Sequence, residues 1–519
     1  MNLSQFRNEP LSDFKSNSGH FRKMQEAVEE VRKELGLRYD LVIGGERIAT
    51  ADKLVSYNPA QKEQVVGSFS KASLDLAERA VRAADQAFRS WSRTAAQDRI
   101  QLLLEAARRL RGRKYYYAAW MVFEVGKSWA EADADVAESI DFCEYYSREM
   151  LRLDQPPPLA SVPGEKNYLR YIPLGVGIVI PPWNFPMAIL VGMTTASIVA
   201  GNTVVLKPSS DSPAIAYKFF ELLEQAGMPP GVVNFLPGSG GTIGDFLVAH
   251  PRTRYVAFTG SKDVGLHINE LAAKHQPGQI WVKRVVAEMG GKDSIVVDSE
   301  TDLEAAADGV TAAAFGFQGQ KCSACSRAIV VEKVYDSFLE KLKERVERIK
   351  VGPPAEPDTT MGPVINASAQ KSILEYIEAG KREGRLITGG GVTSSAGHFI
   401  EPTVIADIPP EGKIAQEEIF GPVLAVIKAR DFDEALDIAN NTEYGLTGAV
   451  YTRDRRKLDR CAESFHVGNL YLNRKCTGAL VGVHPFGGFN MSGTDSKAGG
   501  PDYLLLFTQA KTVSEKIGA

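Results

Sequence analysis

The 519-residue sequence predicts an α/β protein built on parallel sheets. Two observations support this prediction. Short runs of β-branched residues alternate with helix-like segments from residue 175 onward, which is typical of βαβ units. The strand candidates are also apolar throughout, as expected for parallel strands that helices cover on both faces. With a prior of about 150 residues per domain, a chain of this length is expected to form two or three domains.

The predicted elements follow one another regularly along the chain. Charged amphipathic helices are predicted for residues 70–150, and the proline-rich stretch that follows, 154–165, is predicted to be a connector. A first series of buried strands, each followed by a helix, is predicted at 175–180, 203–208, 231–238 and 255–261. The helix after the last of these strands is expected to open near Gly265. A second series of strand and helix signals runs from 294 to about 490.

The composition is that of an ordinary globular protein and argues against several classes. A formal net charge of -4 without basic runs gives no electrostatic basis for binding nucleic acid or an anionic membrane. Five cysteines do not make a disulfide framework, and the polar N-terminus lacks a signal-peptide pattern. The uncharged stretch between Arg170 and Lys207 is broken by prolines, so it lacks the ~20 apolar residues that a membrane span needs. We therefore expect a cytoplasmic protein with no membrane or nucleic-acid partner.

The stretch "FQGQKCSACSR" at 317–327 places Cys322 and Cys325 at a C-x-x-C spacing. A zinc site needs four ligands, but this is the only close cysteine pair and the seven histidines supply no H-x₃₋₅-H partner, so no metal is expected. A redox dithiol would be expected at a helix start in a small βαβ domain, which this context does not provide. Two buried, packing cysteines remain an alternative. The flanking residues are polar and rich in glycine, which favours a thiol that projects from a flexible turn and is accessible.

Three other stretches hold residues of catalytic or binding types. Glu288 ends an apolar run in "AEMGGKD", although a surface carboxylate is the commoner reading of such a residue. Asn184 lies in "PPWNFP" after a predicted parallel strand, where open α/β sheets bind ligands, but it could be an ordinary turn asparagine. Gly260 and Ser261 end another strand, and Gly265 is placed near a helix N-terminus that could face a phosphate. Alone, each signal is weak.

In their order along the chain, these stretches resemble the aldehyde dehydrogenase superfamily from about residue 40 to 510. The matching motifs are "PWNFP", "KPSS", "FTGS", "EMGGK", "GQKCSACSR", "QEEIFGPV", "YGLTGAV" and "HPFGG". The chain is most similar to the 1-pyrroline-5-carboxylate dehydrogenase branch, which oxidises glutamate semialdehyde to glutamate in proline breakdown. That narrower resemblance depends on "FRNEP", "ADVAESIDFCEYY", "GFQGQKCSACSR" and "YLNRKCTGALVGVHPFGG". Without several hundred further N-terminal residues, the monofunctional form is expected.

The resemblance also implies a domain organisation and an assembly. A Rossmann-type NAD-binding domain is expected from residues 1–158 and 172–289, and an α/β catalytic domain from 290–488. Residues 159–171 and 489–519 are expected to form a small oligomerisation hairpin. A homodimer or a higher homo-oligomer would follow from it.

The family's catalytic residues carry over to this sequence one by one. Cys322 is expected to attack the aldehyde as a thiolate, and an ordinary thiol pKa of ~8.5 means that a local positive charge or donor must help. The Asn184 amide and the Cys322 backbone N–H would stabilise the resulting oxyanion. Glu288 would then activate the water that hydrolyses the thioester. Cys325 has no implied role beyond packing.

The resemblance implies NAD as cofactor. The expected contacts are Lys207 with the adenine ribose, Gly260 and Ser261 with the pyrophosphate, and Glu418 and Phe420 with the nicotinamide ribose and ring. The complete set of expected cofactor residues is Trp183, Lys207, Ser210, Gly260, Ser261, Gly265, Glu418 and Phe420. Many NAD-preferring relatives have Glu in place of Ser210, and because serine does not repel a 2′-phosphate, use of NADP is left open.

The expected substrate contacts divide between the two ends of glutamate semialdehyde. Backbone N–H groups at Gly478 and Ala479 and the Ser323 hydroxyl would receive the α-carboxylate, since burying that charge unpaired would be costly. Phe185 and Phe486 would clamp the aliphatic middle. Glu138 is expected to pair with the ammonium. The alternative is a dehydrogenase for a different aldehyde, because the pocket and not the fold sets specificity.

Overall fold

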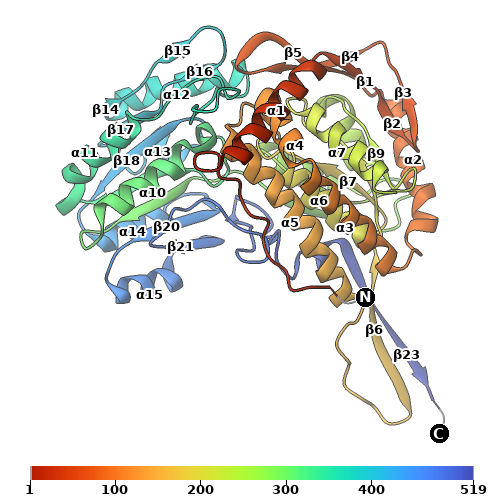
Figure 1. Cartoon of the computed structure of the whole chain (residues 1–519). Coiled ribbons are helices and arrows are strands. Elements are labelled where there is room, and N and C mark those ends of the chain that lie inside the picture. The colour runs from red at the N-terminus through yellow and green to blue at the C-terminus, as the bar shows by residue number, and fades with distance from the viewer. Residues whose placement is uncertain (1–2, 518–519) are drawn as a thin grey trace.

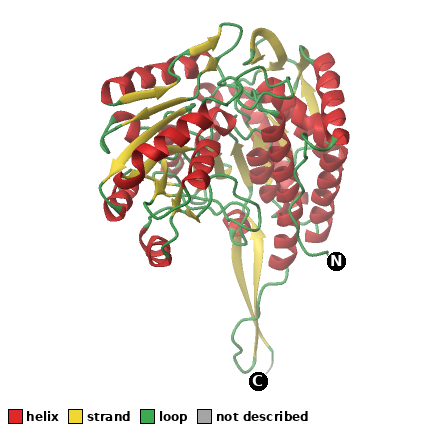
Figure 2. Ribbon diagram, turned by 60° about the vertical axis from the view of Figure 1, so that its left-hand side comes forward, coloured by secondary structure: helices red, strands yellow, loops and turns green. Residues whose placement is uncertain are grey.

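The computed structural model describes residues 3–517. Within that range the chain forms two seven-stranded sheets with helices packed around them and a two-stranded ribbon that projects from the body (Figures 1 and 2). Residues 1, 2, 518 and 519, at the outer ends of the predicted NAD-binding and oligomerisation segments, lie outside the described residues.

The α-helices are α1 Ser18–Glu34, α2 Leu74–Trp91, α3 Ala96–Gly112, α4 Lys114–Glu124, α5 Trp129–Leu153, α6 Ala188–Val199, α7 Pro213–Gln225, α8 Asp245–Ala249, α9 Lys262–Ala273, α10 Leu303–Phe315, α11 Tyr335–Val346, α12 Ala367–Glu383, α13 Lys413–Gln416, α14 Phe432–Asn440 and α15 Arg455–Ser464. Short turns of other helix types are η1 Gly240–Gly244, η2 Gly316–Gly319, η3 Glu332–Val334 and η4 Tyr503–Phe507.

The strands are β1 Leu37–Tyr39, β2 Leu41–Ile43, β3 Glu46–Ile48, β4 Lys53–Asn58, β5 Gln61–Ser70, β6 Glu165–Pro173, β7 Val176–Ile180, β8 Thr203–Leu206, β9 Val233–Phe235, β10 Thr253–Thr259, β11 Arg284–Glu288, β12 Asp293–Val297, β13 Cys325–Val331, β14 Arg385–Thr388, β15 Val392–Ser394, β16 Phe399–Ile400, β17 Thr403–Ala406, β18 Val423–Ala429, β19 Tyr444–Gly445, β20 Thr447–Tyr451, β21 Asn469–Leu472, β22 Phe489–Asn490 and β23 Thr508–Lys516.

The first sheet has the strand order β11-β10-β7-β8-β9-β2-β3. Its strands from β11 to β9 run parallel, as the apolar runs predict. Alternate side chains enter two different cores: Val204 and Leu206 pack with α6 and α7, whereas Val205 packs with Ile178 on the opposite face. Both faces are therefore covered, which explains why most residues of these strands are apolar. Two N-terminal strands, β2 and β3, extend the sheet in antiparallel fashion.

The second sheet has the order β14-β17-β18-β13-β12-β20-β21 and is parallel except at β14. Here too the side chains alternate between two cores. Val297 and Val330 face the core under α10 and α11, and Val296 and Ile329 face the core under α12 and α14. The predicted α/β class with parallel sheets is confirmed.

Two predicted boundaries in the first sheet differ from the structure. The helix expected to open near Gly265 begins at Lys262, because Ser261 takes the extended conformation of an N-cap (φ -70°, ψ 151°). The strand expected at 231–238 is shorter, and the helix expected near 241–249 starts with the wider turn η1 before α8. Helix α9 therefore starts a turn earlier than predicted, with Gly265 inside it.

The projecting ribbon consists of β6 and β23, which pair antiparallel from Glu165↔Lys516 to Pro173↔Thr508 (Figure 1). Residues 154–164 connect α5 to β6 without regular structure, as the prolines predict. The ribbon's second strand starts at Thr508, whereas β22 at the beginning of the segment 489–519 pairs with β19 in the body. No helix within residues 3–517 combines the length and the apolarity that crossing a membrane requires.

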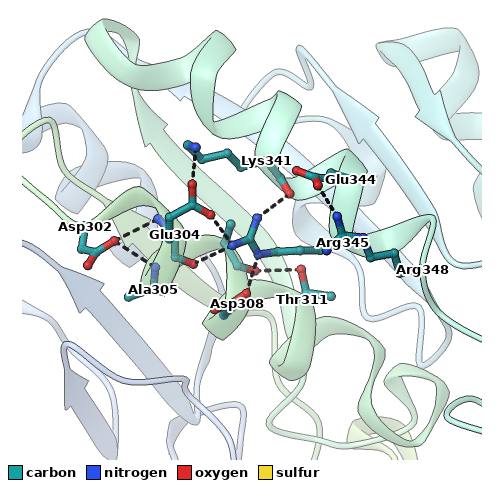
Figure 3. A network of polar contacts seen from close by, with 10 residues as sticks. Asp302, Glu304, Ala305, Asp308, Thr311, Lys341, Glu344, Arg345 and Arg348 are labelled. Atoms are coloured by element: carbon teal, nitrogen blue, oxygen red, sulfur yellow. Dashed lines mark hydrogen bonds and ion pairs between the residues drawn. The ribbon is translucent and has the colours of Figure 1, made fainter.

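Helices α10 and α11 are joined at the surface by a polar network (Figure 3). The Arg345 guanidinium contacts the carboxylates of both Glu304 and Asp308, and Lys341 also reaches Glu304. Exposed pairs of this kind contribute little individually, about 0–1 kcal/mol each. The position of these ion pairs is more important than their strength, because α10 leads directly into the turn that carries the Cys322 thiol.

Candidate active site

Cys322 lies between η2 and β13, in a turn with unusual backbone geometry. Phe317 (φ 47°) and Gln318 (φ 58°) adopt left-handed conformations that are uncommon for residues other than glycine. The Gln318 amide holds this turn by donating to the carbonyls of Gly126 (3.0 Å) and Pro363 (2.8 Å). The polar side chains of the turn are buried, which differs from the predicted flexible, accessible turn, and Cys322 itself is half-buried.

Asn184 follows β7 and is 4% exposed. Its Nδ2 donates to the Gln320 carbonyl at 3.0 Å, two residues before the thiol. Gln320 is fixed in turn, since its Oε1 accepts from the Ile365 backbone N–H at 2.9 Å. An amide carries two N–H donors, and the bond to Gln320 uses one of them. The amide is thus oriented beside the thiol, with one donor left for an oxyanion.

Glu288 is the last residue of β11, and a neighbouring segment, 492–496, holds it in place. The Ser496 hydroxyl donates to its carboxylate, and the Ser496 backbone N–H lies 3.4 Å from Oε1. The other oxygen, Oε2, is buried without a partner. Burial raises the pKa of Glu288 to about 7, and the two bonds from Ser496 oppose that rise. A carboxyl with a pKa near neutrality suits a general base.

The two cysteines of the motif have different surroundings. Burial, followed by the charges of Asp293, Glu418 and Glu288, raises the pKa of the Cys322 thiol well above its usual value. The thiol therefore needs a positive charge nearby before it ionises. Cys325 is 1% exposed in the core under α10, and its Sγ lies 3.4 Å from the Arg327 carbonyl. These are the surroundings of a packing residue.

Lys207 and the start of α9 lie at carboxyl ends of the first sheet. Lys207 is 6% exposed, and its Nζ is 3.4 Å from the carbonyl of the adjacent Pro208. Burial lowers its pKa to about 8. Gly260 and Ser261 form the junction of β10 and α9, where the Ser261 side chain makes no capping bond. Ser210 is exposed in the loop beyond β8.

Gly265 is closely packed against neighbouring side chains. It is buried one turn into α9, and a Cβ there would lie 2.4 Å from Sδ of Met289 and 3.2 Å from the Phe258 ring. Glycine at this position lets the helix approach β10 and the residue after Glu288 closely. A side chain at this position would point into the protein interior, and the contact of Gly265 with the cofactor stays a prediction.

Glu418 and Phe420 lie close to the turn that carries the thiol, and Trp183 contacts Phe420. Glu418 Oε1 accepts from the Gly291 N–H at 3.0 Å, and burial raises the pKa of this carboxyl to about 7. Phe420 is held at φ 57°, and its ring packs edge-on against Trp183 with centroids 5.5 Å apart. Gly290 leaves room for the carboxylate, since a Cβ there would be 2.2 Å from Glu418 Oε2.

These groups fit a dinucleotide cofactor. Lys207 is a buried ammonium without an anionic partner, which suits hydrogen bonds to ribose hydroxyls. The free N-terminus of α9 suits a pyrophosphate. Glu418 can accept from a second ribose, and the adjoining aromatic pair of Trp183 and Phe420 can border a flat ring. Residues 3–517 hold no cluster of three or more His, Cys, Asp or Glu side chains suited to a metal ion.

Two of the predicted substrate residues, Phe185 and Glu138, lie in the loop after β7 and on α5. Phe185 follows Asn184, and the Lys127 ammonium lies 4.1 Å from its ring centroid while pairing with Asp135 at 2.7 Å. On the same helix as Asp135, Glu138 has its pKa raised to about 8, by burial first and by Asp135 second. A carboxyl in these surroundings gains from a cationic ligand.

The remaining predicted substrate residues lie near the C-terminal end of the chain or beside the thiol. Ser323 is 8% exposed, and its carbonyl lies 3.4 Å from the Cys476 Sγ, so the loop after β21 contacts the residue next to Cys322. Gly478 is exposed with φ 80°, and Ala479 follows it, half-buried. Phe486 is half-buried and bonded through its backbone N–H to Ala498 at 2.9 Å.

Sequence reasoning missed three polar features of the site. Ser496 lies 208 residues from the carboxylate it contacts, and no local pattern signals that pairing. Lys292 is 1% exposed, its Nζ has no hydrogen-bond partner, and burial lowers its pKa to about 7. Lys321, next to the thiol, pairs with Glu131 at 2.7 Å. Lys292 and Lys321 lie within the "EMGGKD" and "GQKC" motifs, so their neighbourhood could have identified them.

Comparisons with known proteins agree with this geometry. The model of the aldehyde dehydrogenase family matches residues 48–513. The chain belongs to the aldehyde dehydrogenase family. Among relatives of this aldehyde dehydrogenase, the 1-pyrroline-5-carboxylate dehydrogenase of Geobacillus kaustophilus is 61% identical over 98% of this chain and 99% of its own.

Solved structures resemble this aldehyde dehydrogenase closely. The 1-pyrroline-5-carboxylate dehydrogenase from Thermus with bound NAD has a TM-score of 0.98 and 51% identity, covering 99% of this chain and 100% of that one. Proline utilization A from Bdellovibrio bacteriovorus has a TM-score of 0.97 and 45% identity over 99% of this chain but 53% of its own. The predicted resemblance to this branch of aldehyde dehydrogenases is confirmed.

Proposed function

We propose that this aldehyde dehydrogenase oxidises L-glutamate 5-semialdehyde, the open form of 1-pyrroline-5-carboxylate, to L-glutamate with NAD, as a step of proline degradation. The observation that carries the proposal is the similarity to 1-pyrroline-5-carboxylate dehydrogenases, which covers both this chain and the relatives almost completely. The arrangement of thiol, amide and carboxylate described above provides the groups that the reaction needs.

In the first chemical step, Cys322 adds to the aldehyde carbon. The thiol has to lose its proton, which its buried and acidic surroundings oppose. When bound, NAD would supply a positively charged ring near the thiol and the acceptor for the hydride that the adduct releases as its oxyanion collapses to the thioester. Asn184 donates its second N–H to the developing oxyanion, together with the backbone N–H of Cys322. Because the bond to Gln320 already orients the amide, little reorganisation is needed during the reaction.

In the second step, Glu288 acts on the thioester at Cys322. Its carboxylate accepts a proton from water, whose oxygen attacks the acyl carbon, and the thiolate leaves with release of glutamate. The pKa of about 7 means that a large fraction of Glu288 is ionised at neutral pH. The unpartnered Oε2 is the atom available to the water, since Oε1 is occupied by Ser496.

The cofactor residues support NAD and leave room for NADP. Lys207, the start of α9, and Glu418 with Phe420 are the groups that would hold the dinucleotide. Ser210 has no charge that would repel a 2′-phosphate, and it lies exposed beyond β8. We therefore propose that NADP is used as well, less effectively than NAD.

The projecting ribbon supports an assembly of several copies. A two-stranded ribbon is marginally stable on its own in water, so β6 and β23 would gain from pairing with another copy. We propose a homo-oligomer of at least two chains, a cytoplasmic location, and the domain division of 1–158 with 172–289, 290–488, and 159–171 with 489–519.

The proposed substrate can be tested with a substrate pair and a matched variant pair. The kcat/KM for glutamate semialdehyde should exceed that for propanal or hexanal by a large factor. Gly478→Val should reduce this preference by narrowing the loop that receives the α-carboxylate. Gly227→Val is the control, because Gly227 has a comparable backbone (φ 96°), has no neighbour within 4 Å of an added Cβ, and lies in the turn after α7. Similar kcat/KM values for all three aldehydes would contradict the proposed substrate and favour another aldehyde.

A further inference from the structure

The N-terminal arm, residues 3–16, contains the motif "FRNEP", which the mechanism above does not use. The arm precedes α1 and runs along α5 (Figure 1). It has no regular structure, so its position depends on side-chain contacts. Some of those contacts reach α3 and α4, and others reach two elements that also carry predicted substrate residues: α5, and the loop formed by residues 477–484.

Asn8 joins these two elements directly. Its Nδ2 donates to the Asp141 carboxylate on α5 at 2.8 Å and to the Val481 carbonyl in the loop at 2.9 Å. Both amide hydrogens are thereby used. The second Asp141 oxygen accepts from the Glu9 backbone N–H at 2.7 Å, which fixes the arm to the helix. Burial raises the pKa of Asp141 to about 6, and the donors from the arm oppose that rise.

An aromatic contact supports the same connection. The Phe6 ring packs edge-on against Tyr145 of α5, with centroids 5.1 Å apart. Both rings lie over Gly482, where a Cβ would be 3.0 Å from Phe6 and 2.9 Å from Tyr145. Glycine at this point, with φ 75°, allows the loop to pass beneath the two rings.

The connected elements bear the groups expected to bind the charged end of the substrate. Glu138, the expected partner of the ammonium, lies three residues before Asp141 on α5, so both project from neighbouring positions of one helix. Gly478 and Ala479, expected to bind the carboxylate, lie in the loop that Asn8 holds through Val481. The spacing between the ammonium and carboxylate subsites therefore depends on how α5 and the loop are fastened together.

We propose that the N-terminal arm is a strap that sets this spacing, with Asn8 as the residue that determines specificity for an aldehyde bearing an α-amino acid head group. The inference rests on the proposed function, since it concerns the same substrate. Asn8 is a positioning residue that acts through Val481 and Asp141. Recognition of a simple alkyl aldehyde does not use either subsite and should not depend on the strap.

The test compares Asn8→Ala and Asn8→Asp with a control, Asn17→Ala. Asn17 belongs to the same N-terminal region and caps α1, with its side chain accepting from Gly19 and His20, but it does not contact the loop. For each protein, KM and kcat are measured with glutamate semialdehyde and with propanal at saturating NAD. Thermal unfolding of each variant is recorded alongside.

In Asn8→Ala we expect the KM for glutamate semialdehyde to rise about tenfold, because the variant loses two hydrogen bonds and one of them has a charged partner. The kcat with that substrate and both constants with propanal should change less than about twofold, and Asn8→Asp should raise the KM further because its carboxylate faces Asp141. Asn17→Ala should keep the substrate preference of the unmodified protein. Turnover of propanal reports that each variant is folded.

The proposed role of the strap is contradicted if Asn8→Ala keeps the preference for glutamate semialdehyde over propanal. It is also contradicted if the variant impairs the reaction with both substrates equally, which would indicate a purely structural role. An unmodified protein that does not prefer glutamate semialdehyde would contradict the proposed function instead. The two failures are thus separated by the behaviour of the unmodified protein.

Discussion

The first sheet and the second sheet meet the active site with opposite ends of their strands. Asn184, Lys207 and Glu288 lie at or beyond the carboxyl ends of β7, β8 and β11. By contrast, Cys322 precedes the first residue of β13, and Glu418 precedes that of β18. The two sheets therefore face each other across the site, and the groups that we propose to react come from both.

This difference decides what each sheet can contribute. Carboxyl ends of parallel strands in open sheets are the general place for ligand binding, and the first sheet follows that rule. The second sheet presents amino ends, so its thiol depends on a specially shaped turn, with left-handed Phe317 and Gln318 held by buried side-chain bonds. In the proposed mechanism, the first sheet supplies a general binding edge, and the second supplies the loop that carries the nucleophile.

The largest effect is expected at the amino end of β13. Cys322→Ser should lower turnover by on the order of 10³-fold or more, because a hydroxyl is a far weaker nucleophile here than a thiolate. Cys325→Ser should keep most of the activity, since its side chain is buried in packing. Steady-state NADH formation measures both. An inactive but folded Cys325→Ser enzyme beside an active Cys322→Ser enzyme would reverse the assignment.

The next effect concerns the carboxyl end of β11. Glu288→Gln should slow thioester hydrolysis by about 10²–10⁴-fold, because the amide cannot accept a proton from water. Hydride transfer should remain, so rapid mixing should show a burst of NADH followed by slow turnover. If the burst also disappears, Glu288 acts earlier, on the thiol or on cofactor binding.

A smaller effect is expected where the 492–496 segment contacts that same carboxylate. Ser496→Ala removes a hydrogen bond that lowers the pKa of Glu288, so this pKa should rise above about 7, by about one unit. The ionised form is the active base, and the rise of the hydrolysis rate with pH should therefore move to higher pH. At pH 7 we expect about a fivefold loss, with recovery at higher pH.

Ser492→Ala provides the control for this shift. Ser492 is equally buried in the same segment, but its hydroxyl accepts from the Gly445 N–H and does not contact Glu288. Its pH profile should match that of the unmodified protein. A shift of the same size in both variants would mean that the segment acts through packing alone.

The smallest effect on the reaction with NAD is expected at the exposed loop beyond β8. Ser210→Glu should weaken NADP use by about tenfold through charge repulsion, moderated by salt at this exposed position. The kcat/KM for NAD, measured in parallel, should change little. An equal loss for both dinucleotides would indicate that Ser210 does not lie near the 2′-position.

The contrast between the sheets also explains how much the sequence could predict. Apolar strands that alternate with helices predicted the parallel sheets. The position of Asn184 after a strand predicted its place at the carboxyl edge of the first sheet, where such sheets bind ligands. The surroundings of Cys322 required the family resemblance, because nothing in "GFQGQKC" indicates a buried, left-handed turn. Long-range contacts such as Ser496 with Glu288 and Asn8 with Val481 have no local signal, since the tertiary fold alone brings them together.

The most direct test of the mechanism is to locate the acyl group. Glu288→Gln is mixed with NAD and glutamate semialdehyde, quenched in acid during the slow phase, digested and mapped by mass spectrometry. We predict a glutamyl thioester on the peptide that contains Cys322, specifically at that residue, and its release by hydroxylamine. An adduct at Cys325, or none while NADH has been formed in a burst, would contradict the assignment of Cys322 as nucleophile and Glu288 as hydrolytic base.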